Sequence, residues 1–377
     1  MSLIRAVFQS STMRILQISS ASSFGGGERY AVDLSNSLTK RGHDLFAAVR
    51  PQSPLVNYLQ LPSANIKTLP LRNALDAPTA QALARIVKEN QIDVVHAHMA
   101  RDYSLAAYAV RSNPSAKFFV TRHVLFSLNS LHRHTLGKAA KVIAVSNAVA
   151  QQLRSQQLVP EEKIAVVPNG IDVGRYRRAL ENFDRKSFLE SKQLPTNSLL
   201  VGSIGELRIL KRHDDFIRAA ARVAHEVPNT HFVIAGVDTS ANEEYRRQLQ
   251  ALVVDVGLSD RVHFLGWLDD ADHLLCALDA FVSTSETESF GLSIAEAMAT
   301  GTPVVATRTE GAQEVVEDET SGLLVPIGNV DQIAAALIRL LKDQELRMQL
   351  GARAAKVVQE RFSLDRMVDE IERLYQG

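Results

Sequence analysis

The sequence is poor in cysteine and in long apolar runs. Its 377 residues include one cysteine, Cys276, so a single chain cannot form a disulfide or a cysteine-based metal cluster. We interpret Cys276 as a buried structural thiol, because it lies in an apolar stretch. No apolar run approaches the roughly 20 residues of a membrane-spanning helix, and segment 3–8 is too short for a signal-peptide core. These absences predict a cytoplasmic protein.

An excess of charge of either sign is also lacking. Lys plus Arg and Asp plus Glu both number 42, so no global positive field favours nucleic acid as a partner. Apolar residues make up 46% and charged residues 22%, which is typical of a globular protein. The length is sufficient for two domains.

Short β-branched runs alternate with helix-like segments along the whole chain, which predicts parallel βα units. The expected strands form two sets: 14–19, 44–49, 94–97, 118–121, 142–145 and 164–167, then 199–204, 231–235, 262–265, 280–283, 304–307 and 323–325. Residues 1–12 precede the first strand and are interpreted as an extension with little bearing on function. The turn-rich stretch 168–172 separates the two sets, and we expect a hinge there.

The pattern predicts an α/β fold with one Rossmann-like domain over 1–170 and another over 171–362. We expect a helix over 363–377 to cross back to the first domain. Open parallel sheets bind ligands at the carboxyl ends of their strands. Two such sheets that face one another would therefore share a central cleft, and functional residues are expected in the loops that follow strands.

The segment 283–299 is the most informative, since it runs from a strand end into a helix. Glu288 and Glu296 are eight residues apart, and a mostly helical interval would separate them by roughly 10 to 12 Å. This distance suits two ends of one nucleotide-sugar. The amides of Phe290, Gly291 and Leu292 would open the helix, where partial positive charge favours a diphosphate.

Glu288 to Glu296 resembles the E-x7-E motif of the retaining GT-B glycosyltransferases of family GT4. The resemblance covers nearly the whole chain through a series of motifs in the expected order: Phe24-Gly-Gly-Gly-Glu-Arg-Tyr, Asp93-Val-Val-His-Ala-His, Thr121-Arg-His, Val167-Pro-Asn-Gly-Ile-Asp, Lys211, Phe264-Leu-Gly-Trp and Gly301-Thr-Pro-Val-Val. It implies a GT-B fold, with an acceptor-binding first domain and a donor-binding second domain.

The resemblance also implies roles for individual residues. Glu288 would hold the hydroxyls of the donor sugar, and Glu296 those of the ribose. His123 would approach the donor sugar near the reacting centre. Lys211 would face the diphosphate. Members usually carry an arginine where this chain has Glu206, and Arg208 is a candidate replacement.

Four glycines and one aromatic residue complete the expected donor site. Gly25, Gly26 and Gly27 follow the first strand and form a predicted phosphate and acceptor loop, because glycine lets the backbone approach a ligand closely. Gly266 and Trp267 resemble the segment that lines the nucleobase pocket, although a lone tryptophan is also typical of simple packing.

Two patterns that suggest a metal have simpler explanations. His96 and His98 share a strand face, but no carboxylate or cysteine lies close in sequence to complete a zinc site. Asp270 and Asp272 match a D-x-D pattern, yet they begin a predicted helix, where N-capping and the helix dipole explain them. We therefore expect no metal and no other cofactor, the nucleotide-diphosphate sugar being a co-substrate.

The predicted function is retaining, metal-independent transfer of a hexosyl unit from a UDP- or GDP-sugar to a hydroxyl of a glycan or lipid-linked acceptor, as in cell-envelope polysaccharide synthesis. A sugar-nucleotide epimerase and a non-catalytic sugar-nucleotide sensor are the alternatives. The basic residues of segment 132–141 fit either a peripheral contact with the inner face of a membrane or a solvated helix face. Neither the sugar nor the oligomeric state can be deduced from the sequence.

Overall fold

The computed structural model of the chain describes residues 12–377 and consists of two compact units. Unit 1 is Met1–Val145, Val149–Val167 and Val368–Gly377, and unit 2 is Ser146–Ala148 and Pro168–Met367. Apart from its last residue, the predicted extension over 1–12 lies outside the described residues, as does segment 3–8.

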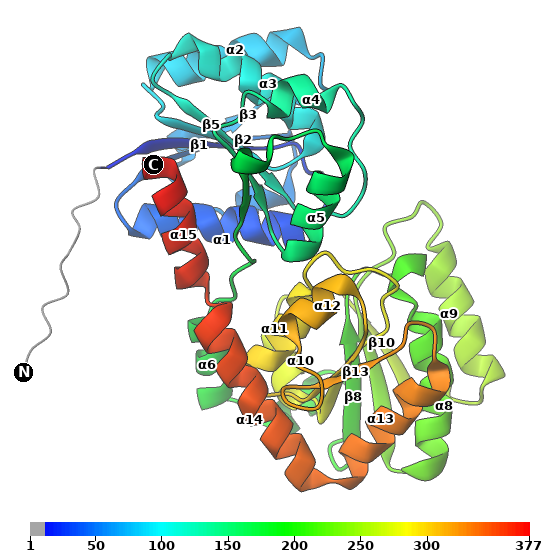
Figure 1. The fold of residues 1–377 in the computed structure, drawn as a ribbon. Coiled ribbons are helices and arrows are strands. Elements are labelled where there is room, and N and C mark those ends of the chain that lie inside the picture. Colours follow the sequence, from blue (N-terminus) through cyan, green and yellow to red (C-terminus); the bar gives the residue numbers. More distant parts are fainter. Residues whose placement is uncertain (1–11) are drawn as a thin grey trace, which may run out of the picture. The chain divides into compact units, whose positions relative to one another are not determined.

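Unit 1 contains a seven-stranded parallel sheet in the order β3-β2-β1-β4-β5-β6-β7 (Figure 1). The strands are β1 (Arg14–Ser19), β2 (Asp44–Val49), β3 (Ile66–Thr68), β4 (Val94–Ala97), β5 (Lys117–Arg122), β6 (Lys141–Ala144) and β7 (Ile164–Val166). The sequence analysis missed β3, which is an edge strand of three residues with no fully buried side chain. So short and so polar a segment carries no alternating pattern.

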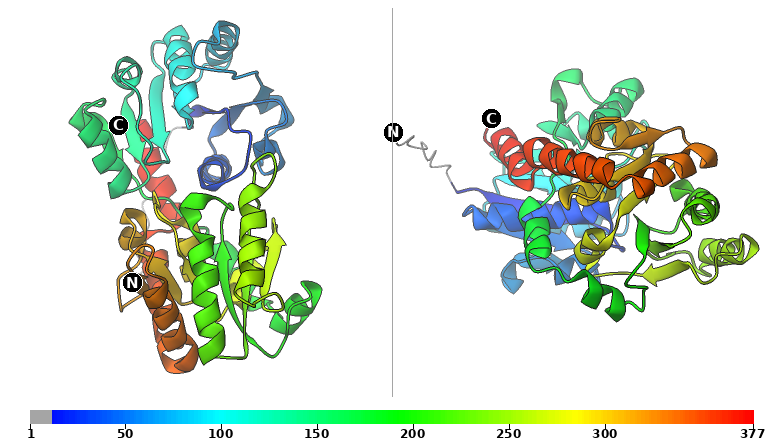
Figure 2. Two further views of the ribbon diagram at one scale, coloured as in Figure 1. Left: turned by 90° about the vertical axis from the view of Figure 1, so that its right-hand side faces the viewer. Right: turned by 90° about the horizontal axis from the view of Figure 1, so that it is seen from below.

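Helices cover both faces of this sheet (Figures 1 and 2). They are α1 (Gly26–Lys40), α2 (Ala77–Glu89), α3 (Tyr103–Ala109), α4 (His132–Leu136), most of α5 (Asn147–Gln156) and the end of α15 (Leu364–Gln376). In α1 the buried residues include Tyr30, Leu34 and Leu38, which lie on one helix face because they are four residues apart. Asp76 caps α2 by accepting a hydrogen bond from Thr79 N, a type of contact worth about 1 kcal/mol.

Unit 2 contains a six-stranded parallel sheet in the order β10-β9-β8-β11-β12-β13. Its strands are β8 (Leu199–Ile204), β9 (Thr230–Ala235), β10 (Val262–Gly266), β11 (Ala280–Ser283), β12 (Val304–Thr307) and β13 (Leu323–Val325). Its helices are α6 (Val173–Glu181), α7 (Arg185–Ser191), α8 (His213–Glu226), α9 (Glu244–Asp255), α10 (Ala271–Ala277), α11 (Leu292–Ala299), α12 (Glu310–Val315), α13 (Val330–Lys342) and α14 (Gln344–Arg361).

Two hydrophobic cores form on the two faces of this sheet because successive strand residues point to opposite sides. Leu200 and Val233 belong to one core with residues of α11, whereas Val201 and Phe232 belong to the other with residues of α8 and α13. This double burial explains the near-continuous apolar strands that made the sheet predictable.

The expected hinge at Asn169 and Gly170 is a site of close packing inside unit 2. Gly170 N donates to Met367 Sδ at 3.1 Å, and a Cβ at position 170 would lie 2.6 Å from Leu364 Cα. Ile171 N donates to Phe362 O at 2.8 Å, and Leu364 N donates to Ile171 O at 2.9 Å. A substitution at Gly170 would therefore disturb packing, and the hinge expected in 168–172 stays a prediction.

Candidate functional site

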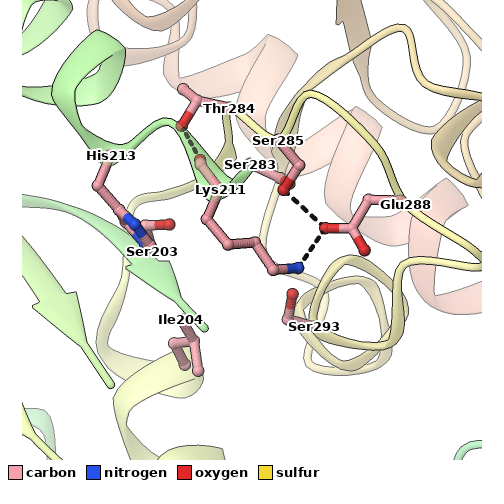
Figure 3. Close-up of a pocket in the computed structure, with 9 residues that line it drawn as sticks. All are labelled: Ser203, Ile204, Lys211, His213, Ser283, Thr284, Ser285, Glu288 and Ser293. Carbon is pink, nitrogen blue, oxygen red and sulfur yellow. Dashed lines mark hydrogen bonds and ion pairs between the residues drawn. The ribbon is translucent and has the colours of Figure 1, made fainter. Parts of the chain in front are cut away.

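A polar pocket lies where β8 and β11 end in unit 2 (Figure 3). Its polar lining residues come from the ends of the two strands, the loops that follow them and the first turns of α8 and α11: Ser203, Lys211, His213, Ser283, Thr284, Ser285, Glu288 and Ser293. The carboxyl ends of parallel strands are the usual place for ligands in such sheets. The wall combines an ammonium, a carboxylate and five hydroxyl groups.

Lys211 and Glu288 form an ion pair at the centre of this pocket (Figure 3). Lys211 Nζ donates to Glu288 Oε1 at 2.6 Å, and Ser285 Oγ donates to the same oxygen at 2.7 Å. The Glu288 side chain is 11% exposed and that of Lys211 is 28% exposed. Both bonds are charge-assisted, the stronger class of hydrogen bond. The sequence predicted both residues, and the structure brings them together across 77 positions.

Hydrogen bonds to three backbone carbonyls of its own loop hold Lys211 in place. Thr284 Oγ1 donates to Lys211 O at 2.9 Å and to Arg212 O at 2.8 Å. Glu286 N donates to Leu210 O at 2.8 Å. These bonds connect the loop after β8, which carries Lys211, to the loop after β11, which carries Glu288. The two partners of the ion pair are therefore held next to each other.

Arg212 sustains an uncommon backbone conformation directly after Lys211. Its φ of +49° and ψ of +42° lie in the left-handed region, which costs a non-glycine residue of order 1 kcal/mol. The two carbonyls that accept from Thr284 and the ion pair of Arg212 Nε with Asp215 Oδ2 at 2.7 Å hold this conformation. The strained residue thus directly follows Lys211, in the loop that places the Lys211 side chain in the pocket.

His213 is a polar lining residue that the sequence analysis did not single out. It is 1% exposed, and its Nδ1 has no hydrogen-bond partner among residues 12–377. Burial, assisted by the nearby Lys211, lowers the pKa of His213 to about 3. The ring is therefore neutral beside the ion pair.

The sequence analysis also did not single out Ser285, Thr284 and Ser293. The spacing of Ser285 and Glu288 is that of the serine and glutamate in a helix capping box, which could have indicated Ser285.

Helix α11 begins later than the sequence analysis assumed. It starts at Leu292, with Gly291 as its N-cap at φ +94°, a conformation that favours glycine. Only the four steps from Leu292 to Glu296 are helical, about 6 Å, so the interval is not mostly helical and the estimate of 10 to 12 Å does not apply. Glu296 lies half-buried on this helix. Phe290 is 2% exposed and belongs to the core, so it can offer a ligand only its backbone.

Arg208 lies outside the group of residues that line the pocket. Its side chain is 53% exposed and pairs with Glu206 at 3.4 Å. Glu206 Oε1 also accepts a hydrogen bond from Thr239 Oγ1 at 2.6 Å. The structure thus pairs Glu206, which departs from the expected pattern, with Arg208, its candidate replacement, and a diphosphate role for Arg208 stays a prediction.

Gly266 and Trp267 follow β10 at the carboxyl edge of the same sheet. Trp267 is 49% exposed, and its Nε1 donates to Asp269 Oδ1 at 3.0 Å. The alternative of simple packing does not describe this ring, because half of it is exposed.

Cys276 in α10 differs from expectation, because the thiol is half-buried rather than buried. Burial still raises its pKa to about 11.

Unit 1 holds His123 in a row of imidazoles at the carboxyl end of β5. His98 Nδ1 lies 3.3 Å from His123 Nε2, and His98 Nε2 lies 2.7 Å from Gln17 Oε1. Burial lowers the pKa of His98 to about 3. Burial, with His98 and Arg122 adding to it, also holds the pKa of His123 well below its usual range. Both rings are neutral.

The hydrogen bonds of this row define its tautomers. The amide oxygen of Gln17 can only accept, so His98 Nε2 carries the proton and His98 Nδ1 is an acceptor. His123 Nε2 then donates to His98, which leaves His123 Nδ1 as a bare acceptor. His96 is held separately, by Tyr375 Oη at 2.5 Å and Thr121 Oγ1 at 2.7 Å.

The predicted glycine loop is the start of α1, which begins at Gly26 with Gly25 as N-cap. Glu28 Oε2 accepts from Gly25 N at 3.0 Å. A Cβ at Gly27 would lie 3.3 Å from Cγ of His123. Gly27 therefore allows the His123 ring to pack against the first turn of α1, a contact that the phosphate-loop interpretation did not foresee.

The side chains considered for a metal have other partners. Asp272 Oδ2 accepts from Arg175 Nε at 2.8 Å, and Asp270 pairs with Lys192 at 2.9 Å. Asp270 is the N-cap of α10 by position, but its side chain makes no capping hydrogen bond, so that part of the explanation was wrong. Within the described range, 12–377, no three His, Cys, Asp or Glu residues are grouped so as to hold a metal ion.

None of the helices found between residues 12 and 377 combines the length and the apolar character that crossing a bilayer requires.

Comparisons with known proteins agree with this architecture. Residues 184–357 match the family "Glycosyl transferases group 1", and residues 24–175 match "Glycosyltransferase Family 4". An N-acetyl-alpha-D-glucosaminyl L-malate synthase of Bacillus anthracis is 29% identical over 370 residues, 94% of both chains. The lipopolysaccharide core biosynthesis glycosyltransferase LpsE of Rhizobium meliloti is 29% identical over 350 residues, 92% of this chain and 94% of its own.

Among solved structures, Anabaena HepE in complex with UDP-glucose superposes with a TM-score of 0.83 at 22% identity. The match covers 95% of this chain and 98% of HepE. At that identity the likeness shows the fold, two parallel-sheet α/β domains of the GT-B class. Together, the family matches to both halves and the named relatives show that the chain is a glycosyltransferase of the GT4 type.

Proposed function

We propose that the chain transfers a hexosyl unit from a UDP- or GDP-sugar to an acceptor hydroxyl, with retention of configuration and without a metal ion. The observation that carries the proposal is the Lys211–Glu288 pair in a hydroxyl-rich pocket at a sheet edge. An ammonium beside a carboxylate offers one group for phosphate oxygens and one for sugar hydroxyls. HepE, whose fold is similar, binds UDP-glucose.

The donor is proposed to use these groups as follows. Lys211 has three N–H donors, one of which goes to Glu288, so the others are available to the diphosphate. The unpaired amides at the start of α11 add partial positive charge. Glu288 accepts hydrogen bonds from the sugar and Glu296 from the ribose. Positive groups placed where the leaving diphosphate gains charge stabilise the transition state.

His123 is proposed to accept a hydrogen bond from a sugar hydroxyl near the reacting carbon. Its bare Nδ1 suits that role, because a neutral imidazole with one protonated nitrogen accepts at the other. Glu288 is not proposed as a nucleophile, since one of its oxygens already accepts from both Lys211 and Ser285.

A glycan or lipid-linked acceptor in cell-envelope polysaccharide synthesis is the proposed context, supported by the Rhizobium relative of lipopolysaccharide core synthesis. We further propose a cytoplasmic protein that contacts the inner face of a membrane through basic residues of segment 132–141, of which His132 and Arg133 begin α4.

A panel of UDP- and GDP-sugars tests the proposal. We expect release of the nucleoside diphosphate with one donor class, and NMR of the glycoside should show the anomeric configuration of the donor retained. Inversion would overturn the retaining part. An epimerised nucleotide-sugar formed without acceptor would favour an epimerase, and donor binding without any turnover would favour a sensor.

A further inference from the structure

Several arginines lie at the carboxyl edge of the unit 1 sheet. Four loops or strand ends each supply one: Arg50 after β2, Arg72 after β3, Arg101 after β4 and Arg122 at the end of β5. None of these four forms an ion pair with any residue in the described range 12–377. Arg122 instead donates to the carbonyl of Phe126.

Some arginines at other sheet edges do form ion pairs. At the opposite edge of the same sheet, Arg14 pairs with Asp44 at 3.8 Å, and Arg41 pairs with Asp369 at 2.6 Å. At the carboxyl edge of the unit 2 sheet, Arg308 pairs with Asp318 at 2.6 Å. The four arginines at the carboxyl edge of the unit 1 sheet differ from these three in making no ion pair within residues 12–377, as do other arginines such as Arg111.

The loops that carry Arg50 and Arg101 are fixed to two adjacent residues, Ala21 and Ser20 respectively. Ser53, in the turn after Arg50, donates from Oγ to Ala21 O at 3.2 Å. Asp102, next to Arg101, accepts from Ser20 N through Oδ2 at 2.8 Å. The segment Ser20–Ala21 therefore aligns both arginine-bearing loops, and ligand sites on such anchored loops are pre-organised.

Asp102 interacts electrostatically with both arginines. It is fully buried, its Oδ1 has no hydrogen-bond partner within residues 12–377, and both Arg50 and Arg101 act on its charge. Burial nevertheless raises the pKa of Asp102 to about 6. The carboxylate points into the protein, whereas Arg101 is exposed and Arg50 half-buried, so both guanidinium groups retain N–H donors toward solvent.

We propose that the acceptor substrate carries an anionic group, a phosphate or a carboxylate, and that Arg50 and Arg101 bind it at the carboxyl edge of the unit 1 sheet. Guanidinium groups match the planar, two-oxygen geometry of both oxyanions. This inference rests on the proposed function, because it assigns the substrate class of the acceptor and leaves the donor site as described.

The test compares glucose, glucose 6-phosphate and glucuronate, which share a ring and differ in the anionic group. Their binding to the full chain is measured by NMR in the presence of saturating nucleoside diphosphate, which occupies the donor site. We expect at least one charged sugar to bind about 10-fold or more tightly than glucose. Preference for one of them identifies phosphate or carboxylate as the source of the charge.

Three variants locate the effect. R50Q and R101Q should each weaken binding of the charged sugar about 10-fold with an unchanged melting temperature. R111Q, which alters an exposed arginine of the same unit away from this edge, should have no effect. Equal binding of all three sugars, or unchanged binding in both R50Q and R101Q, would overturn the inference. Donor turnover is assayed in parallel samples without nucleoside diphosphate, and absence of turnover in the wild type would instead contradict the proposed function.

Discussion

The two units place opposite kinds of polar groups at corresponding positions in their sheets. At the carboxyl edge of unit 2, Lys211 and Glu288 are charged and 2.6 Å apart. At the carboxyl end of β5 in unit 1, His98 and His123 are neutral rings linked at 3.3 Å. The same parallel-sheet scaffold thus supports strong fixed charge in one unit and directional, uncharged hydrogen bonding in the other. Charge suits a nucleotide diphosphate, and a neutral acceptor suits a sugar hydroxyl.

Removing the charged pair should have the largest effect. We expect Glu288→Gln and Lys211→Ala each to reduce transfer about 100-fold or more, because each removes a group that acts on the donor. Steady-state kinetics and thermal melting measure activity and fold. Glu286→Gln is the matched control, since Glu286 is a 51% exposed neighbour of the same loop. Full activity of either site variant would remove that residue from the donor site.

The neutral row should respond more weakly to mutation. Gln17→Met removes the acceptor that sets the His98 tautomer, so His123 loses its fixed proton position. We expect kcat to fall about 10-fold while donor affinity stays unchanged. Nitrogen chemical shifts of the imidazoles should show mixed tautomers. Gln81→Met, at an exposed position of α2, serves as control, and wild-type shifts with the proton on His123 Nδ1 would contradict the assignment.

Acid should lower the stability of both units, because each contains a buried, neutral histidine. The folded-state pKa values of His98 and His213 are about 3, below the usual unfolded value of about 6.5. The unfolded chain therefore gains protons first as the pH falls. Stability is fully present above about pH 6.5 and falls between there and about pH 3. Each ring should cost about 2 kcal/mol at pH 5.

Denaturant unfolding at pH 7 and pH 5 measures this loss. His213→Gln should make the fall between these two values smaller by about 2 kcal/mol, because the variant has no imidazole to titrate there. An NMR titration midpoint of His213 near 6.5 in the folded protein would show that burial does not suppress its charge.

The smallest expected effect is that of a chelator. We expect EDTA to leave turnover unchanged, since Lys211 and the amides at the start of α11 are proposed to stabilise the leaving group. Loss of activity that magnesium or manganese restores would overturn metal independence. It would also reopen the question of Asp270 and Asp272, which then would have to leave Lys192 and Arg175 to bind an ion.

The sequence predicted the strands closely because both faces of each sheet are buried. All twelve expected strands lie within one residue of the observed ones, and the missed β3 is a short edge strand with an exposed side chain. The exact start of α11 was less predictable, because it depends on the left-handed conformation of Gly291.

The candidate site was predictable only as far as residue types and the family resemblance allowed. Both indicated Lys211 and Glu288, but neither revealed the support from Thr284, whose hydroxyl bonds to backbone carbonyls that any residue type would supply. Tertiary contacts of this kind leave no pattern in sequence. The exposed position of Arg208 likewise depends on its partner, Glu206.

The lone thiol of Cys276 has a practical consequence for spectroscopy. With a pKa raised to about 11 it remains protonated at neutral pH, and it is half-buried, so maleimide reagents that attack the thiolate should react with it slowly. A cysteine introduced at an exposed position of either unit can therefore be labelled selectively without removing the native one. Fluorophore or spin-label pairs could then be attached through two such introduced thiols in an otherwise native chain.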